Sequence, residues 1–260
     1  MTDKGVQTIN RALDIIEILS MERQGLGVTE IGNRTGLHKS TAHRLLNTLA
    51  ERGYIEREPQ NGSYRLGLKF VEVSSIYLNK IELKTEAQPF LRKLVETVGQ
   101  PAHLAILNGT DAIYIEKIEA LSSIRLYSQI GRRIPAYCSA LGKALMAGLN
   151  ESDLNKLADQ TDFYPYTQNT ILNKADLLKS VDLVRKKGYA VDDEEHDEGV
   201  RCIAAPVYDY TGRIIASVST AGDKKIISKE RDDEIGKYVK EAAEGISRRM
   251  GYTNPVYPAF

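Results

Sequence analysis

The fold of the N-terminal part is decided by residues 29–49, Thr29-Glu-Ile-Gly-Asn-Arg-Thr-Gly-Leu-His-Lys-Ser-Thr-Ala-His-Arg-Leu-Leu-Asn-Thr-Leu49. We expect a short helix here, capped by the Thr29 hydroxyl and ended by Gly36, followed by a longer helix. The longer helix places its apolar residues on one face, namely Ala42, Leu45, Leu46 and Leu49. This pattern is typical of a helix-turn-helix, whose second helix lies in the major groove of DNA.

The opposite face of that second helix carries basic and hydrogen-bonding side chains. At about 100° per residue, Ser40, Arg44 and Asn47 point away from the apolar face. Arg can make two hydrogen bonds to guanine, and Asn can do the same with adenine. No Asp or Glu occurs between Ile31 and Ala50, so the surface is locally basic. The residues expected to contact DNA from this helix are Lys39, Ser40, Thr41, His43, Arg44 and Asn47.

The segments around this helix pair complete the motif. An apolar stripe predicts a helix over residues 8–21, and residues 54–58 and 63–66 are expected to form strands joined by an Asn-Gly turn. Arg57 and Arg65 would place this hairpin against phosphates or the minor groove. Residues 1–67 are therefore expected to form a winged helix-turn-helix. A solvated amphipathic helix in a small helical bundle is the alternative, but the combined pattern favours DNA binding.

Composition limits the other possibilities. The chain has 260 residues, 42% hydrophobic and 27% charged, and a formal net charge of zero, so any attraction to DNA must come from a local patch. Cys138 and Cys202 do not suggest a disulfide framework. Neither a signal-peptide core nor an apolar stretch long enough to cross a membrane is found in the sequence. We expect a cytoplasmic protein.

The pattern changes after the hairpin. Residues 68–98 are predicted to be helical with a break or kink at Pro89, and residues 68–83 are expected to form a linker helix. Residues 84–260 are then expected to form an α/β domain, which makes the chain an α+β protein. Its predicted strands are residues 103–107, 112–118, 124–129, 189–192, 202–208 and 214–219, and its predicted helices are 139–149, 152–158, 174–187 and 228–250.

Three segments carry recognisable motifs. They are Gly36-Leu-His-Lys-Ser-Thr-Ala-His-Arg-Leu-Leu46, Pro135-Ala-Tyr-Cys-Ser-Ala-Leu-Gly-Lys-Ala-Leu-Met-Ala147 and Asp192-Asp-Glu-Glu-His-Asp-Glu-Gly-Val-Arg-Cys-Ile-Ala-Ala-Pro-Val207. In this order they resemble the IclR family of bacterial transcription regulators over nearly the whole chain. The resemblance implies a GAF-like C-terminal effector-binding domain, homodimers that often pair into homotetramers, and a small organic acid as effector. His38 departs from the family pattern, which has Pro at this position.

The residues themselves indicate one anion site. Ser139 precedes a predicted helix, and the free amides at a helix N-terminus bind anions. The resemblance adds further effector contacts, which match Leu126, Ala140, Leu141, Asp192, Cys202 and Ser219. The family's second strand Ser falls at Ala221, so one hydroxyl contact is missing here. The 130–143 segment resembles most the regulators of 2-keto-3-deoxygluconate catabolism, and we expect a repressor.

Each of these positions has a simpler structural interpretation. Cys202 can be a small buried apolar residue, Ser139 only an N-cap, and Ser219 only a partner of nearby backbone. Lys143 is interpreted as exposed or structural, and Gly142 as a close-packing residue.

A metal site and an enzyme active site are alternative interpretations of the same region. Asp192, His196, Cys202 and Cys138 have ligand types that suit zinc, but their spacing matches no standard motif, and no metal or cofactor is predicted. A cytosolic enzyme with Cys202 as nucleophile and His196 as base is the alternative function, although no nucleophile signature supports it.

Overall fold

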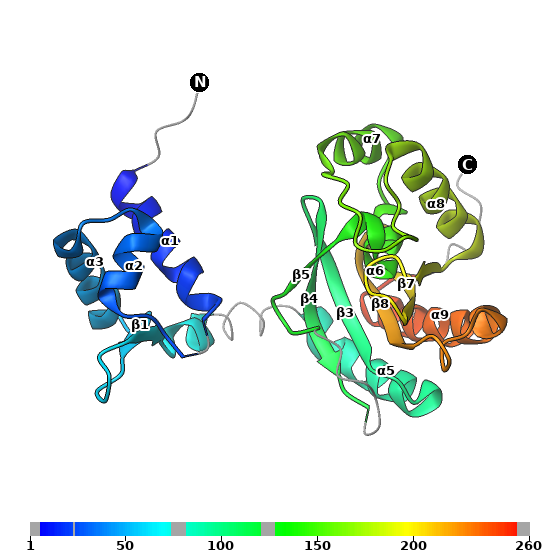
Figure 1. The fold of residues 1–260 in the computed structure, drawn as a ribbon. Coiled ribbons are helices and arrows are strands. Elements are labelled where there is room, and N and C mark those ends of the chain that lie inside the picture. Colours follow the sequence, from blue (N-terminus) through cyan, green and yellow to red (C-terminus); the bar gives the residue numbers. More distant parts are fainter. Residues whose placement is uncertain (1–5, 23, 74–81, 121–127, 254–260) are drawn as a thin grey trace. The chain divides into compact units, whose positions relative to one another are not determined.

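The chain divides into two compact units, residues 1–80 and 81–260, each described here by itself (Figure 1). The computed structural model describes residues 6–22, 24–73, 82–120 and 128–253. Within these residues, none of the helices combines the length and apolar character that a membrane crossing requires.

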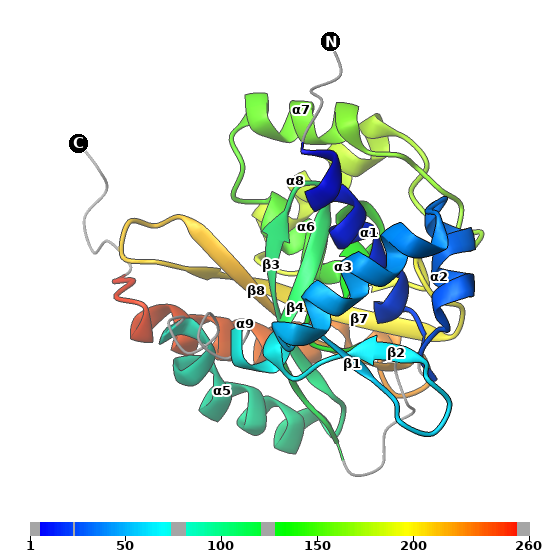
Figure 2. The same ribbon diagram turned by 90° about the vertical axis from the view of Figure 1, so that its left-hand side faces the viewer.

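The N-terminal unit is a winged helix-turn-helix, as predicted (Figure 2). Its elements are α1 (Gln7–Ser20), α2 (Val28–Thr35), α3 (Lys39–Glu51), β1 (Ile55–Arg57) and β2 (Tyr64–Leu66). The two strands pair antiparallel. The apolar face of α3 packs on a core that includes Ile15, Leu19, Ile31, Leu45, Leu46 and Ile55.

The helix boundaries in this unit confirm one prediction and correct another. Gly36 ends α2 in the left-handed region at φ +66°, where glycine is favoured. The predicted Thr29 cap is wrong, because α2 begins at Val28 with Gly27 as its N-cap, so Thr29 lies inside the helix. His38 is the N-cap of α3 at φ −61°. Proline fixes φ near this value, so His38 keeps the backbone that Pro would impose.

The helix around Pro89 differs from the predicted one. The proposed linker helix 68–83 is helical over residues 69–73, and residues 74–81 lie outside the described ones. The helix α5 (Glu82–Val98) runs without a break through Pro89. Pro89 is exposed, while Ala87, Leu91 and Leu94 bury the other side of α5 in the core. Tertiary packing thus overrides the local break signal.

The C-terminal unit is built on one antiparallel sheet with the strand order β5-β4-β3-β8-β7-β6. The strands are β3 (Ala102–Asn108), β4 (Asp111–Ile118), β5 (Arg133–Pro135), β6 (Ala190–Asp193), β7 (Val200–Tyr208) and β8 (Ile214–Asp223). The predicted strand 124–129 is tested only at its end. Residues 124–127 lie outside the described ones, and residues 128–129 are not in a strand.

Helices cover both faces of this sheet (Figure 1). One face is covered by α5 and α9 (Asp232–Arg249), and the other by α6 (Ala140–Met146) and α8 (Lys174–Lys187), with α7 (Glu151–Gln160) packed against α8. Successive strand residues point to opposite faces. Accordingly, Leu104 packs in the core under α5 and α9, and Ala105 packs in the core under α6. Two short 3₁₀ turns, Ala136–Cys138 and Lys229–Arg231, precede α6 and α9.

The start of α6 is pressed against the preceding turn. A Cβ on Gly142 would lie 2.2 Å from the Cα of Ala136, so only glycine allows this approach. The Ser139 hydroxyl accepts a hydrogen bond from the Gly142 amide and donates one to the Pro135 carbonyl. Ser139 is therefore an N-cap and Gly142 a close-packing residue, and a role of Ser139 in effector binding stays a prediction.

Candidate functional site

The outer face of α3 is open to solvent. Lys39, Ser40, Arg44 and Asn47 are exposed, and Thr41 and His43 are partly buried. Among the described residues, no side chain pairs with the guanidinium of Arg44, whereas Arg34 is engaged by Glu22 and Glu30. Because an α-helix fits into the major groove, the guanidinium of Arg44 on α3 is suited to contact bases or phosphates.

The two basic residues of the hairpin have closer partners. The guanidinium of Arg57 lies 5.9 Å from the centre of the Tyr64 ring. Arg65 pairs with Glu56 at 3.3 Å and with Glu58 at 3.5 Å, although its side chain remains about half exposed. Exposed ion pairs of this kind are weak, so a phosphate can compete for Arg65.

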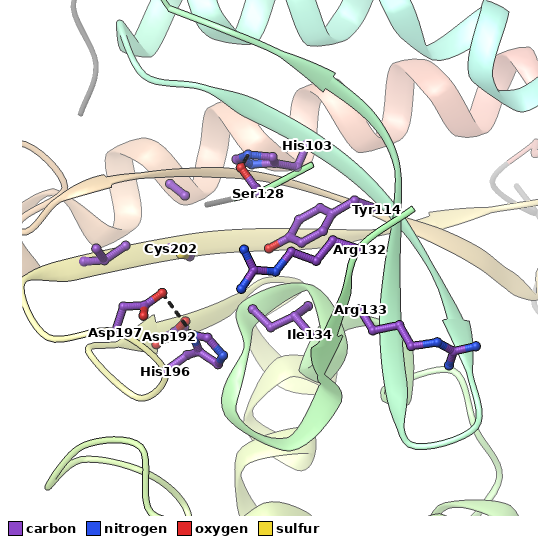
Figure 3. Close-up of a pocket in the computed structure, with 12 residues that line it drawn as sticks. His103, Tyr114, Ser128, Arg132, Arg133, Ile134, Asp192, His196, Asp197 and Cys202 are labelled. Atoms are coloured by element: carbon purple, nitrogen blue, oxygen red, sulfur yellow. Dashed lines mark hydrogen bonds and ion pairs between the residues drawn. The ribbon is translucent and has the colours of Figure 1, made fainter. Parts of the chain in front are cut away.

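The C-terminal unit holds a cavity on the α6 face of the sheet (Figure 3). It encloses about 650 Å³, its open mouth included. Strand register explains its floor, because Asp192 of β6, Cys202 of β7 and Ala221 of β8 stand side by side in one row. The other lining residues are His103, Tyr114, Ser128, Arg132, Arg133, Ile134, His196, Asp197 and Val200.

One wall of the cavity presents neutral hydrogen-bonding groups. The His103 Nε2 lies 2.9 Å from the Ser128 hydroxyl, and the Lys117 ammonium donates to the Ser128 carbonyl at 3.0 Å. Burial, assisted by Lys117, lowers the pKa of His103 to about 3, so its imidazole is neutral at pH 7. Tyr114 and Arg132 lie beside this pair, whereas Arg133 extends away from the cavity (Figure 3).

The facing wall carries the acids of the 192–199 segment. Asp192 is 3% exposed, and burial together with the charge of Glu195 raises its pKa to about 7. The ring of His196 contacts the Asp197 carboxylate at 2.9 Å, and this contact lowers the pKa of Asp197. The cavity thus combines one guanidinium with neutral donors and an acid that titrates near neutrality.

The chemistry of Cys202 argues against a nucleophile. Cys202 is partly buried on the cavity floor, and desolvation together with the charge of Asp192 raises the pKa of its thiol well above its usual range. The reactive form of cysteine is the thiolate, so a raised pKa makes this thiol a poor nucleophile at neutral pH. Among the described residues, no three His, Cys, Asp or Glu side chains come together in a way that could hold a metal ion.

The structure brings together only some of the sequence-predicted effector residues. Asp192 and Cys202 line the cavity, whereas Leu126 lies outside the described residues. Ser219 is buried one row further along the sheet, paired with His103 on β3 and Ala204 on β7. Ser139, Ala140 and Leu141 are buried at the start of α6 and do not belong to the lining of this cavity. The role of all seven residues in effector binding stays a prediction.

Sequence reasoning missed the wall formed by His103, Tyr114 and Ser128. These residues come from β3, β4 and the segment before β5, and they reach the row of Asp192 only through strand pairings across the sheet. A signal was present, because His103 is a lone imidazole in an otherwise apolar strand. For Lys143, the structure favours the structural interpretation over the exposed one, because its side chain is 1% exposed and paired with Glu195.

Comparisons with known proteins agree with both units. The IclR helix-turn-helix domain matches residues 8–59, and the bacterial transcriptional regulator IclR C-terminal domain matches residues 75–248. The HTH-type transcriptional regulator XynR of Escherichia coli K12 is 38% identical over 250 residues, which cover 95% of this chain and 98% of XynR. KdgR of the same organism is 35% identical over 247 residues, which cover 95% of this chain and 94% of KdgR.

The fold agrees as well. The crystal structure of Thermotoga maritima IclR superposes with a TM-score of 0.80 at 30% sequence identity, over 95% of this chain and 100% of that one. Because these proteins are transcriptional regulators, the Cys202 enzyme hypothesis is not supported. From its helix-turn-helix, its C-terminal sheet domain and these similarities, the chain belongs to the IclR family of DNA-binding transcriptional regulators, which are not enzymes.

Proposed function

We propose that the chain is a repressor that binds operator DNA as a dimer and releases it when a small organic acid enters the cavity on the α6 face. The observation that carries the DNA part is the exposed outer face of α3, where Arg44 has no side-chain partner among the described residues. The wing residues Arg57 and Arg65 supply backbone contacts beside it. In this proposal residues 1–67 bind DNA, residues 84–260 bind the effector, and residues 68–83 link these two domains.

Operator binding is tested with a sequence recovered by selection from random duplexes. Replacing Arg44 or Asn47 by Ala should weaken binding by about 1–3 kcal/mol for a lost bidentate base contact and relax the preference at one base pair. Arg52→Ala is the matched control, because Arg52 is also exposed but follows the end of α3. Equal losses in Arg44→Ala and Arg52→Ala, measured by gel shift at physiological salt, would show that α3 does not read the operator.

The effector is proposed from the chemistry of the cavity. Arg132 provides a cation for a carboxylate, and His103, Ser128, Tyr114 and Asp192 provide partners for hydroxyl or carbonyl oxygens. Such a set suits an acid that carries several oxygens, and a keto-deoxy sugar acid fits this description.

A thermal-shift screen tests the effector. A ligand that binds only the folded state raises the melting temperature. The first plate holds 2-keto-3-deoxygluconate, gluconate, pyruvate and benzoate. An acid that stabilises the protein should also release the operator in gel shifts, and Arg132→Gln should abolish both effects. Stabilisation without release would contradict the proposed control of DNA binding.

We propose that the effector controls operator binding by shifting the dimer between two conformational states. A ligand changes an equilibrium only by its different affinities for the two states. We propose that the state with the acid bound holds the two α3 helices at a spacing that no longer matches two half-sites. Pairing of dimers into tetramers is compatible with this mechanism and is decided by analytical ultracentrifugation.

A further inference from the structure

The feature that the proposed function leaves unused is Lys143, a lysine buried inside the C-terminal unit. It lies on α6 with 1% of its surface exposed. Its ammonium donates to the Val191 carbonyl at 2.6 Å and forms an ion pair with the Glu195 carboxylate. Lysine is almost never fully buried unless it is paired. This contact therefore joins α6 to the 192–199 segment, which consists of the end of β6 and the loop after it.

Other elements also contact the 192–199 segment. Arg201 and Lys229 pair with Asp193, Lys224 pairs with Glu194, and the ring of Tyr166 stacks on His196. The Thr167 and Thr170 hydroxyls donate to the carbonyls of Glu194 and Glu195, each at 2.6 Å. Glu194 has φ +60°, which is uncommon and unfavourable for a residue other than glycine. A segment with an irregular backbone needs its surroundings to fix it, and Lys143 supplies the only ammonium buried against it among the described residues.

The ion pair is connected to the cavity through Asp192. The amide of Glu195 donates to the Asp192 carboxylate at 2.8 Å, so the residue that Lys143 holds also orients Asp192. Asp192, His196 and Asp197 all lie on this segment and all line the cavity.

We propose that Lys143 and Glu195 form a buried latch that positions the 192–199 segment, and with it Asp192, as one wall of the cavity. Lys143 is thus a positioning residue rather than a ligand contact. The consequence for effector affinity rests on the proposed function, but the latch itself can be tested without any effector.

The charges around Asp192 make the latch measurable. The Lys143 ammonium pairs with the Glu195 carboxylate, and its charge also acts on the buried Asp192 carboxylate. The Lys143 charge lowers the pKa of Asp192, and the Glu195 charge raises it. The other titratable groups that interact with Asp192 are His196 on its own segment, Cys202 on β7, Tyr114 on β4 and Cys138 before α6.

The main test is amide hydrogen exchange of the full chain, without ligand. Lys143→Met should speed exchange in peptides covering 192–199 by about tenfold or more, because it leaves a buried carboxylate unpaired. The matched control is Lys224→Met. Lys224 pairs with Glu194 on the same segment, but half of its side chain is exposed, so the control should change exchange by less than about fivefold. Equal effects in the two variants, or faster exchange spread evenly over β7, β8 and α9, would overturn the latch.

A second variant covers the case in which Lys143→Met does not fold. Lys143→Met combined with Glu195→Gln removes both charges of the latch, and such neutral replacements are often tolerated. This double variant should fold and still exchange rapidly at 192–199. Wild-type protection there would overturn the proposal.

A pH measurement distinguishes an effect of the Lys143 and Glu195 charges on Asp192 from a general destabilisation of the C-terminal unit. The contribution of Asp192 to melting temperature is obtained by comparing each protein with its Asp192→Asn derivative across pH. The midpoint of that contribution should move up by about one pH unit in Lys143→Met and down in Glu195→Gln, because these changes remove opposite charges. Shifts in the same direction would contradict the latch.

Effector binding provides the last comparison. If 2-keto-3-deoxygluconate stabilises the wild type, Lys143→Met should bind it about tenfold or more weakly, and unchanged affinity would refute the positioning role. If no acid in the screen binds the wild type, the proposed effector role fails, and the exchange data still decide the latch.

Discussion

At the scale of single residues, the two arginines Arg44 and Arg65 show how surroundings decide what a charge can do. Arg44 is exposed on α3 without a side-chain partner among the described residues. Arg65 on β2 is engaged by Glu56 and Glu58 of the hairpin. A phosphate that binds Arg65 must displace these carboxylates, and the same carboxylates repel the DNA backbone. Glu56 and Glu58 therefore weaken the attraction of the hairpin to DNA, although the sequence predicted a contact between Arg65 and phosphates or the minor groove.

This weakened attraction leads to a prediction for DNA binding. Replacing both Glu56 and Glu58 by Gln should strengthen binding to any duplex, and the gain should shrink as salt rises, because the interaction is electrostatic. Each exposed pair contributes about 0.2–1 kcal/mol, so the expected gain is a few-fold. Fluorescence anisotropy with a labelled duplex at several salt concentrations measures it. An affinity that stays the same at low salt would show that the wing does not approach DNA.

A second prediction at this scale concerns pH. Because burial raises the pKa of Asp192 from its usual 3.8 to about 7, the folded state binds a proton that the unfolded state has lost. Asp192 therefore makes the protein less stable as pH rises from about 4 to 7, by up to about 1.4 kcal/mol per pH unit. Asp192→Asn keeps an acceptor oxygen for the Glu195 amide and removes this dependence. Its melting temperature relative to wild type should rise across that range.

His103 provides a control, because its effect on the pH dependence of stability has the opposite sign to that of Asp192. Its pKa is lowered to about 3 in the folded state, so stability is lost as pH falls below about 6.5. His103→Gln should therefore gain relative stability toward acid pH, whereas Asp192→Asn gains it toward neutral pH. Melting curves in which both variants drift in the same direction would contradict this assignment.

At the scale of elements, the helix α5 contains an unfavourable residue in its interior. Pro89 has no amide hydrogen to donate and is exposed, so a helical hydrogen bond is missing without a compensating apolar contact. Pro89→Ala should stabilise the C-terminal unit by about 1–3 kcal/mol, since proline costs about 3 kcal/mol relative to alanine inside a helix. Chemical denaturation of the full chain measures the change. A destabilised variant would mean that Pro89 serves a structural purpose that its exposure does not reveal.

Helices and strands marked by local signals, such as a capping residue or a terminal glycine, could be predicted from the sequence. Strands that depend on pairing with a distant strand could not. The helix α8 spans residues 174–187, as predicted, because Asn173 caps its start and Gly188 ends it at φ +77°. The strand β5 was missed, because a three-residue edge strand, Arg-Ile-Pro, has no alternation to detect and takes its place from β4.

The same division applies to the candidate site. Asp192 and Cys202 lie in motifs that a sequence can reveal. Their neighbour Ala221 and the facing His103 are brought to them by strand register, which depends on pairings between distant segments. The burial of Lys143 was equally hidden, because its partner Glu195 is 52 residues away and stands in an acidic run that reads as solvated.

At the scale of the whole molecule, a neutral chain must bind a polyanion. The formal net charge is zero, so long-range attraction to DNA is weak. In the proposed dimer each α3 helix reads one half-site, and affinity and specificity then depend on placing two α3 helices in register. Since coupling between two binding sites is reciprocal, an acid that weakens operator binding must itself bind less tightly to the complex with DNA.

The dependence on register leads to the final prediction. In an operator recovered by selection, two half-sites should lie about one helical turn, or a multiple of it, apart, so that both α3 helices enter the major groove from one side. Inserting about five base pairs between them rotates one half-site to the opposite face, whereas inserting about ten restores the face at a longer distance. Gel shifts should show strong loss of dimer binding with the first insertion and a smaller loss with the second. Equal binding to all three duplexes would mean that each chain binds DNA independently, and control of operator binding by half-site spacing would then be untenable.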